Sequence, residues 1–287
     1  MFVLNVIGKG ADPSLFAGLG DGPPEVLSPG HAFDLPASKS ALPVARRRAL
    51  GLSLDVNLVA IHKRRKKLLV ADMDSTIIGV ECLDELADIA GLKPAVAAIT
   101  ERAMRGELEF EAALMKRVAM LKGLKLEALE KTYAERVRLN PGAKPLLATM
   151  RAQGAHTMLV SGGFGYFTQR VAQAAGFHTQ QGNVLLDDGV RLTGEVAMPI
   201  LGREAKLKAL EEAVADLNLD FAETLAVGDG ANDLAMIRRA GENGGLGVAF
   251  HAKPVVAEAA DAAINHNDLT ALLYLQGYRD SEIVRSE

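Results

Sequence analysis

The hydrophobic positions of this chain change their period along its length, and each change predicts a different kind of element. Apolar runs without alternation mark the expected strands at 68–71, 156–160, 224–227, 246–249 and 262–265. Such runs are typical of parallel strands that are buried on both faces. Helical spacing marks the expected helices at 164–175, 203–215, 232–240 and 268–276. The order of these elements predicts an α/β fold with a doubly wound, mostly parallel sheet.

Four helical patterns in succession separate the first expected strand from the second. They begin near Val80, Pro94, Phe110 and Leu126. A doubly wound sheet needs only one helix at such a crossover, so the surplus predicts a helical cap inserted over residues 79–139. The catalytic core would then comprise 62–78 and 140–287. Within it, Asp187-Asp188-Gly189 indicates a hairpin turn between 183–186 and 191–198.

The N-terminal part of the chain, 1–61, differs in composition from the rest. It holds six of the eleven prolines and many glycines, which favours loops around a strand at Phe2–Ile7 and a helix near Ala41–Leu50. We interpret 1–61 as a short N-terminal segment whose role the sequence leaves open. The basic run at 62–67 that follows indicates either a nucleic-acid or membrane patch or a solvated lead-in to the first core strand. We favour the second interpretation.

Composition narrows the class of protein. The net charge of −4 and the pI near 5.9 argue against a general nucleic-acid binder. Cys82 is the single cysteine, so no intrachain disulfide forms and a structural zinc site is not expected. No apolar stretch approaches the length of a membrane-spanning helix, and Met1–Ile7 lacks a basic leader and a long apolar core. We therefore expect a cytoplasmic protein with neither nucleic acid nor membrane as a partner.

Chemistry-bearing residues follow three of the expected strands. Asp72 and Asp74 come directly after the first strand, Ser161-Gly162-Gly163 after the second, and Asp229 to Asp233 after the third. Parallel sheets bind ligands at these carboxyl ends. Two neighbouring carboxylates suit a hard divalent cation, and a hydroxyl beside glycine amides suits a phosphate oxygen. Taken singly, each is more often a helix cap or a turn. Their order along one chain favours a common site.

The motifs at these positions resemble the four-part signature of the haloacid dehalogenase superfamily of phosphohydrolases. They are Asp-x-Asp-x-Thr at 72–76, Ser-Gly-Gly at 161–163, Lys206 and Gly-Asp-Gly-x-Asn-Asp at 228–233. Glu81, Phe110 and Lys116-Arg117-Val118 are similar to the phosphoserine phosphatase branch. The resemblance covers about residues 66–275 and leaves out the N-terminal segment.

This resemblance implies Mg²⁺-dependent hydrolysis of O-phospho-L-serine, the last step of serine biosynthesis, through an aspartyl-phosphate intermediate. Asp72 would be the nucleophile and Asp74 the general acid and base. Mg²⁺ would be held by Asp72, by the backbone carbonyl of Asp74 and by Asp229, with Asp233 orienting ligands behind them.

The same resemblance assigns the substrate contacts. Ser161, Gly162 and Lys206 would hold the phosphate, and Asn232 would be a further substrate-binding residue that orients ligands or waters. Arg117 would bind the substrate carboxylate and Glu81 its ammonium group. Met104 and Phe110 would shape the wall of the cap. Spacing alone allows two other interpretations: Arg117 at the edge of an apolar helix stripe, and Glu81 as an acid favoured in the first turn of a helix.

Several alternatives remain open at the level of sequence. The same chemistry serves phosphatases of other small esters and phosphotransferases, and a receiver-like signalling module also carries an acid pair and a lysine. A dinucleotide site is disfavoured because the glycine run at 163–168 lacks its third glycine, and a calcium loop because Ala231 occupies a ligand position. The oligomeric state is open, with a homodimer as the candidate, as are feedback by serine and the preference for L over D substrate.

Overall fold

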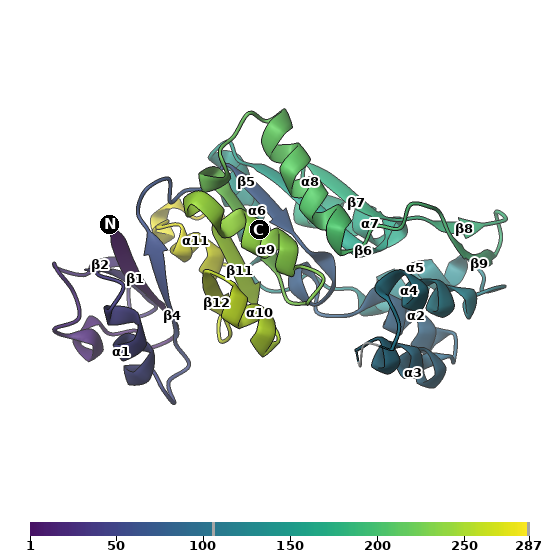
Figure 1. Ribbon diagram of the computed structural model, residues 1–287, viewed down its shortest axis with the longest axis horizontal. Coiled ribbons are helices and arrows are strands. Elements are labelled where there is room, and N and C mark those ends of the chain that lie inside the picture. The colour runs from purple at the N-terminus through teal and green to yellow at the C-terminus, as the bar shows by residue number, and fades with distance from the viewer. Residues whose placement is uncertain (105–106, 286–287) are drawn as a thin grey trace.

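The computed structural model describes residues 1–104 and 107–285, apart from the side chains at 103 and 104. Three parts follow one another along the longest axis of the molecule (Figure 1). A small N-terminal sheet lies at one end, a larger sheet with helices on both faces lies in the middle, and a group of helices lies at the other end.

The central sheet has six strands, and every described pairing between neighbours is parallel. Its order is β12-β11-β10-β5-β6-β7. The strands are β5 (Leu68–Ala71), β6 (His156–Phe164), β7 (Thr179–Asn183), β10 (Thr224–Gly228), β11 (Leu246–Phe250) and β12 (Ala262–Ile264). Five of them match the expected strands. The edge strand β7 was missed because Thr-Gln-Gln-Gly-Asn carries no apolar run.

Helices cover both faces of this sheet, which confirms the doubly wound fold. One face packs on α8 (Arg203–Asp216) and α9 (Leu234–Gly241), and α10 (Pro254–Ala259) lies beside α9. The other face packs on α6 (Ala143–Ala152), α7 (Gly165–Ala175) and α11 (Ala271–Leu275). Leu68 and Val70 point to the first face, and Leu69 and Ala71 to the second. Burial on both sides explains why β5 has no polar alternation.

The expected cap helices are all present between β5 and α6. They are α2 (Cys82–Ile89), α3 (Lys93–Met104), α4 (Phe110–Ala119) and α5 (Glu127–Arg136). The chain leaves and re-enters the core side by side: Ile78 bridges Leu139, and the Asn140 amide donates to the Ile77 carbonyl at 2.8 Å. The two segments that connect the cap to the core therefore run side by side.

The expected hairpin forms as β8 (Leu185–Asp187) and β9 (Leu192–Val196). It lies against the cap at the far end from the N-terminus (Figure 1). Backbone hydrogen bonds fasten it to the turn after α4: Gly123 N donates to Leu192 O at 2.8 Å, and Leu192 N donates to Leu124 O at 2.8 Å. The hairpin thus links the cap to the core at a second place.

The N-terminal region is more ordered than its sequence indicates. It forms an antiparallel sheet in the order β2-β3-β1-β4, covered by α1 (Ala41–Arg48). Its strands are β1 (Phe2–Ile7), β2 (Glu25–Ser28), β3 (Ala32–Ala37) and β4 (Asp55–Ala60). The expected strand and helix are found, but the expectation of loops around them is wrong. Buried polar residues, among them Asn5, Asp34 and Asn57, interrupt the apolar pattern of three strands.

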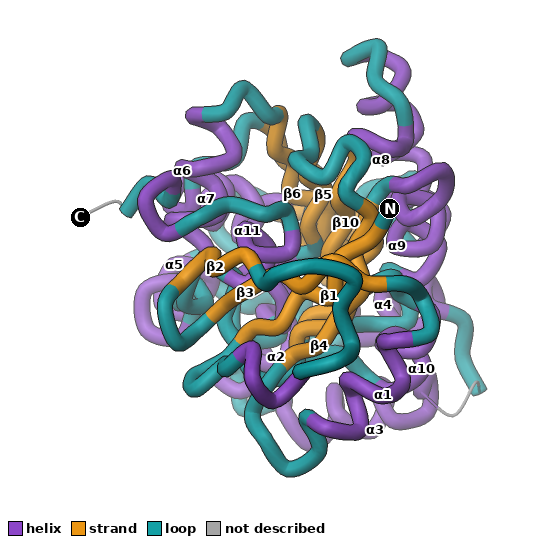
Figure 2. Tube along the Cα trace, turned by 90° about the vertical axis from the view of Figure 1, so that its left-hand side faces the viewer, coloured by secondary structure: helices purple, strands orange, loops and turns teal. Residues whose placement is uncertain are grey.

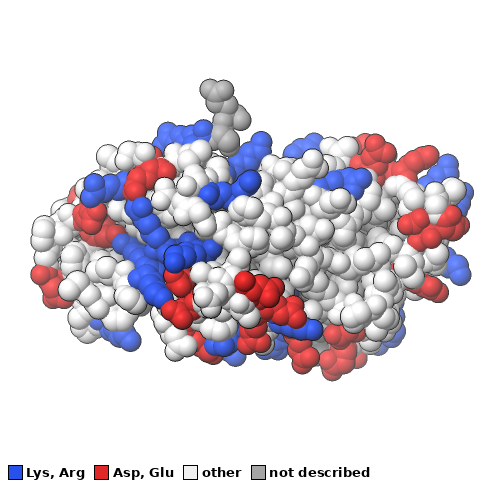
Figure 3. Space-filling view, turned by 90° about the horizontal axis from the view of Figure 1, so that it is seen from above, with Lys and Arg blue, Asp and Glu red and all other residues white. Residues whose placement is uncertain are grey.

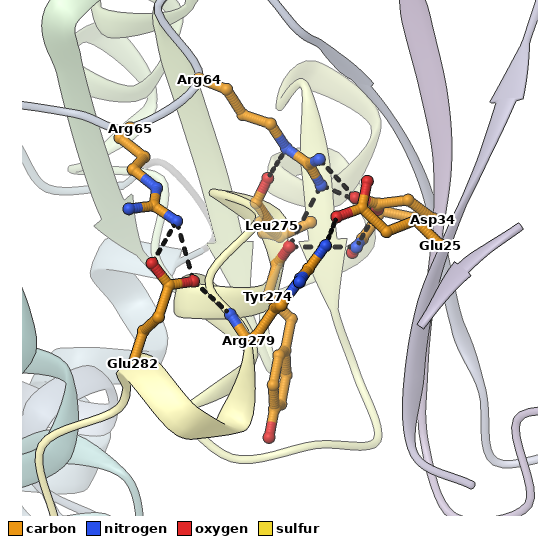
Figure 4. A network of polar contacts seen from close by, with 9 residues as sticks. Glu25, Asp34, Arg64, Arg65, Tyr274, Leu275, Arg279 and Glu282 are labelled. Atoms are coloured by element: carbon orange, nitrogen blue, oxygen red, sulfur yellow. Dashed lines mark hydrogen bonds and ion pairs between the residues drawn. The ribbon is translucent and has the colours of Figure 1, made fainter. Parts of the chain in front are cut away.

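Those polar residues fasten the N-terminal sheet to the core. The Asn57 side chain donates to Ala263 O at 3.0 Å and accepts from Ala263 N at 2.9 Å, so it pairs with β12 as a neighbouring strand would. Arg64 donates to the carboxylate of Asp34 and to Leu275 O at 2.7 Å (Figure 4). Viewed along the long axis, the small sheet lies in front of the central one (Figure 2).

The basic run at 62–67 leads from the N-terminal sheet to β5. In Figure 3, a group of blue side chains lies in the left part of the view, with red side chains beside it. Arg65 pairs with Glu282 at 2.7 Å and Lys67 with Glu223 at 2.7 Å, while buried Lys66 donates to Ala222 O and Gly244 O at 2.7 and 2.9 Å. The expectation of a solvated lead-in is wrong for Lys66 and Arg64. Both side chains are largely buried and make hydrogen bonds within the protein.

Among the helices of residues 1–104 and 107–285, none is long and apolar enough to cross a membrane.

Candidate active site

The three strand ends that carry polar residues meet at one edge of the central sheet. β5 lies between β10 and β6, so Asp72 lies between the ends that lead to Asp229 and to Ser161. The Asp72 amide donates to Val227 O at 3.0 Å, which continues the pairing of β5 with β10 past the last strand residue. The topology therefore gathers residues that are far apart in the sequence.

A buried lysine joins two of the carboxylates. Lys206, from the first turns of α8, donates to Asp72 Oδ1 and to Asp233 Oδ1, each at 2.6 Å. Asp233 also accepts from the Gly230 amide at 3.1 Å. A Cβ at Gly228 would overlap the Asp233 carboxyl, so the turn after β10 requires glycine there. Burial alone would lower the pKa of the Lys206 ammonium, but the two carboxylates outweigh it and raise that pKa.

The carboxylates outnumber this single ammonium. Oxygens of Asp72, Asp229 and Asp233 lie within 4.8 Å of one another. Burial, and then repulsion from Asp233, raises the pKa of Asp229 to about 6 and that of Asp72 well above its usual range. Thr76 Oγ1 donates to Asp229 at 3.3 Å. Oxygen ligands with uncompensated negative charge fit a hard divalent cation such as Mg²⁺.

Asp74 lies beside the glycine turn of β6. One of its oxygens accepts from the Cys82 amide at the start of α2, at 3.2 Å. A Cβ on Gly163 would lie 2.8 Å from its other oxygen. Glycine, which has no Cβ, permits this close approach. Burial, and then the nearby charge of Glu81, raises the pKa of Asp74 to about 7. A carboxyl group with this pKa is suited to both giving and taking a proton near neutral pH.

A family model described as haloacid dehalogenase-like hydrolase matches residues 69–238, more than half of the chain. The chain belongs to the haloacid dehalogenase-like hydrolases. A second model with the same description matches residues 202–275.

Named relatives place it further within this family. It is 46% identical over 230 residues to a phosphoserine phosphatase of Polaromonas sp., covering 78% of this chain and 96% of the relative. It is 43% identical over 236 residues to one of Streptomyces coelicolor, covering 82% of this chain. There the chain spans only 56% of the relative's length. The match thus lies in the phosphoserine phosphatase branch.

A solved structure of a haloacid dehalogenase family hydrolase from Salmonella enterica serovar Typhi superposes on nearly the whole molecule. Its TM-score is 0.83 at 31% identity, covering 96% of this chain and 97% of that one. This coverage includes the N-terminal sheet, which the family models do not reach.

In this haloacid dehalogenase-like hydrolase, cap helix α4 carries two of the expected substrate residues, Phe110 and Arg117. A Cβ on Gly162 would lie 3.1 Å from Cζ of Phe110, so the first residue of α4 covers the glycine turn. Arg117 lies two turns further along α4, and burial lowers its pKa while the charges of Asp84 and Glu81 oppose that shift. Among the described residues, no carboxylate lies within ion-pair distance of its guanidinium.

The remaining expected residues have varied surroundings. Glu81 is exposed and accepts from Ser75 Oγ at 2.7 Å. Ser161 is buried, and its Oγ accepts from the Gly163 amide at 2.9 Å. Asn232 lies against Gly230 of its own turn. The side chain of Met104 lies outside the described residues.

The sequence did not point to two groups that support the carboxylates of the site. Thr76, fully buried, holds Asp229, and the amide of Cys82 holds Asp74. The threonine was visible as the last residue of Asp-x-Asp-x-Thr. The amide carries no signal of its own, because any residue at the start of α2 supplies it.

Proposed function

We propose that this chain hydrolyses O-phospho-L-serine to L-serine and phosphate, as a Mg²⁺-dependent phosphoric monoester hydrolase. The observation that carries the proposal is the convergence of Asp72, Asp74, Asp229 and Lys206 beneath a cap whose helix α4 covers the glycine turn. The relatives named phosphoserine phosphatase support the choice of substrate.

Asp72 is the proposed nucleophile. Its carboxylate attacks phosphorus, the bond to the serine oxygen breaks, and an aspartyl phosphate forms. Lys206, 2.6 Å from Asp72, holds the attacking group in place and offsets the charge of the phosphoryl oxygens. Ser161 and the Gly162 amide hold those oxygens from the other side.

Asp74 is the proposed general acid and base. Its protonated form gives a proton to the departing serine alkoxide, which is a poor leaving group without it. The resulting carboxylate then takes a proton from the water that hydrolyses the aspartyl phosphate. A pKa of about 7 suits both halves of this cycle.

Asp72, the Asp74 carbonyl and Asp229 are the proposed ligands of Mg²⁺, which when bound neutralises phosphoryl charge. Asp233 takes a supporting role in this scheme, since both of its oxygens already accept hydrogen bonds, from Lys206 and from Gly230. Asn232 would orient a ligand or a phosphate oxygen from the same turn.

The cap, residues 79–139, is proposed to select the substrate and to exclude water when it closes. Arg117 would bind the serine carboxylate as a bidentate fork, and Glu81 would accept from the ammonium group. Met104 and Phe110 would form the wall between them. The core is proposed to comprise 62–78 and 140–287. Cytoplasmic location, and a homodimer as the assembly, stay predictions.

A panel of phosphorylated metabolites tests the proposal, assayed for phosphate release with Mg²⁺ and with excess chelator. Phosphoserine should be turned over fastest, with no activity in chelator. Added serine or homoserine should not divert the phosphate, which separates hydrolysis from phosphotransfer. Phosphoserine turnover no faster than that of phosphoethanolamine would refute the assignment of substrate.

A further inference from the structure

Asn183, the last residue of β7, is a buried polar side chain to which the proposed chemistry gives no role. It is 2% exposed. Its Nδ2 donates to Gly162 O at 2.8 Å and to Leu201 O at 3.1 Å, and its Oδ1 accepts from Leu201 N at 2.7 Å. The Asn183 side chain therefore connects the backbone at Gly162 with the backbone at Leu201, which do not pair as neighbouring strands.

The first of these segments is the glycine turn of β6. β6 pairs with β7 as far as Val160 and Gln181, and pairing resumes at Phe164 and Asn183. Four steps along β6 thus correspond to two along β7, so the turn bulges out of the ladder. The Gly162 carbonyl lies within this bulge, and the amide of Asn183 takes the place of the missing strand partner.

The second segment leads into α8. Leu201 directly precedes Gly202, which caps α8 one turn before Lys206. Residues 184–200 between the two anchor points include the hairpin that is bonded to the cap. Asn183 therefore closes the base of the hairpin, steadies the start of the helix that carries Lys206, and holds the glycine turn.

We propose that Asn183 is a positioning residue for the phosphate site, fixing the glycine turn at 161–163 relative to the start of α8. This inference rests on the proposed function, since the turn is taken to bind phosphoryl oxygens. Two sets of phosphate-binding groups, the glycine turn and Lys206, come from different elements, and the three hydrogen bonds of Asn183 set their separation. A shift of about 1 Å at such a site costs on the order of a hundredfold in rate.

Asn183→Asp is the test variant. It keeps the oxygen that accepts from Leu201 N and loses both donated hydrogen bonds, including the one to Gly162. The matched control is Asn57→Asp. Asn57 is similarly buried and makes a two-bond contact to a single residue, Ala263, but at the junction with the N-terminal sheet.

Three readouts are measured with Mg²⁺: kcat/KM for phosphoserine, kcat/KM for p-nitrophenyl phosphate, and the inhibition constant of inorganic phosphate. We expect Asn183→Asp to lower kcat/KM about ten- to hundredfold on both substrates alike, because both share the phosphoryl group, and to weaken phosphate inhibition at least about fivefold. Asn57→Asp should lower the melting temperature and leave all three readouts within about twofold of wild type.

The inhibition constant of inorganic phosphate does not depend on how much of a preparation is folded. It therefore tests the role of Asn183 even in a variant that is only partly folded. Unchanged phosphate inhibition in Asn183→Asp, or a loss confined to phosphoserine, would overturn the inference. So would failure of both Asn183→Asp and Asn183→Ala to fold while Asn57→Asp folds, since Asn183 would then serve the fold alone. Wild type without phosphoserine turnover would instead refute the proposed function.

Discussion

The junction between the N-terminal sheet and the core and the candidate active site both bury carboxylates, but they differ in how far those charges are compensated. At the junction, Asp34 is met by Arg64 and by Asn5, and Asp55 accepts from Asn265 N at 2.8 Å and from Asn267 Nδ2 at 2.8 Å. At the site, Asp72, Asp229 and Asp233 face one another with Lys206 as the single ammonium that the described residues place among them.

Burying a charge is unfavourable unless partners compensate it. The junction supplies its partners from within the chain, so its polar groups set the position of the N-terminal sheet. The site leaves negative charge over, which raises the pKa of Asp72 and Asp229 and leaves room for a cation to compensate them. Incomplete compensation therefore indicates where a ligand belongs.

The largest expected effect is that of Asp72→Asn. Removing the nucleophile should lower kcat for phosphoserine at least about a thousandfold. The metal-free protein should be no less stable than wild type, because Lys206 keeps Asp233 and one repelling carboxylate is gone. Steady-state kinetics and thermal unfolding in chelator measure the two parts. A marked loss of stability would mean that the carboxylates at the site hold the fold together.

Asp34→Ala should have the opposite effect, with a loss of stability and little loss of activity. It leaves the largely buried Arg64 without its carboxylate partner. Breaking such a pair costs about 3 kcal/mol in the free energy of unfolding. The value of kcat/KM should stay nearly unchanged, because the pair lies at the junction and not at the site.

The control for Asp34→Ala is Glu25→Ala. The pair of Glu25 with Arg279 belongs to the same junction but is exposed (Figure 4). An exposed pair of this kind contributes little, so the loss should be about 0.5 kcal/mol or less. Urea unfolding measures the free energy of unfolding of both variants. Equal losses in the two would contradict the claim that the buried pair contributes more than the exposed one.

Arg117→Ala should act on one substrate only. If its guanidinium binds the carboxylate of phosphoserine, the loss is about 1.5–3 kcal/mol, or roughly tenfold to a few hundredfold in kcat/KM. p-Nitrophenyl phosphate lacks that carboxylate and should lose little. The ratio of the two kcat/KM values is the readout. An unchanged ratio would leave Arg117 as a residue at the edge of an apolar stripe.

The smallest effect is a pH dependence of stability at Glu223, which lies beside the start of β5. A hydrogen bond from Lys67, with others, lowers the pKa of Glu223 to about 2 from the 4.5 of a free glutamate. A lowered pKa stabilises the fold above the pKa of the free side chain, and this stabilisation is lost as the pH falls toward that of the folded protein. Lys67 is largely exposed. Glu223→Gln should therefore cost only about 0.5–1 kcal/mol at neutral pH. Urea unfolding at pH 7 and pH 3 should show that the cost shrinks in acid; a constant cost would contradict the assignment.

The same contrast explains what the sequence could predict. Strands such as Leu68–Ala71 and the cap helices carry regular apolar periods, and the acid pairs lie in contiguous motifs, so the core, the cap and the gathering of site residues were predictable. The N-terminal sheet was not, because Asn5, Asp34 and Asn57 are buried through partners far away in the sequence. Asn183 was likewise predicted only as part of a hairpin, since its contacts with Gly162 and Leu201 exist only in the folded chain.

The claim that the uncompensated carboxylates form a cation site is tested most directly by thermal unfolding. Wild type and Asp229→Asn are each unfolded with and without Mg²⁺. A cation that binds the folded state at about a hundred times its Kd adds roughly 2.7 kcal/mol of stability. The melting temperature of wild type should therefore rise in Mg²⁺ and fall back to its metal-free value in chelator. The melting temperature of Asp229→Asn should hardly change with Mg²⁺. An equal rise in both proteins, or no rise in wild type, would contradict a cation site formed by these carboxylates.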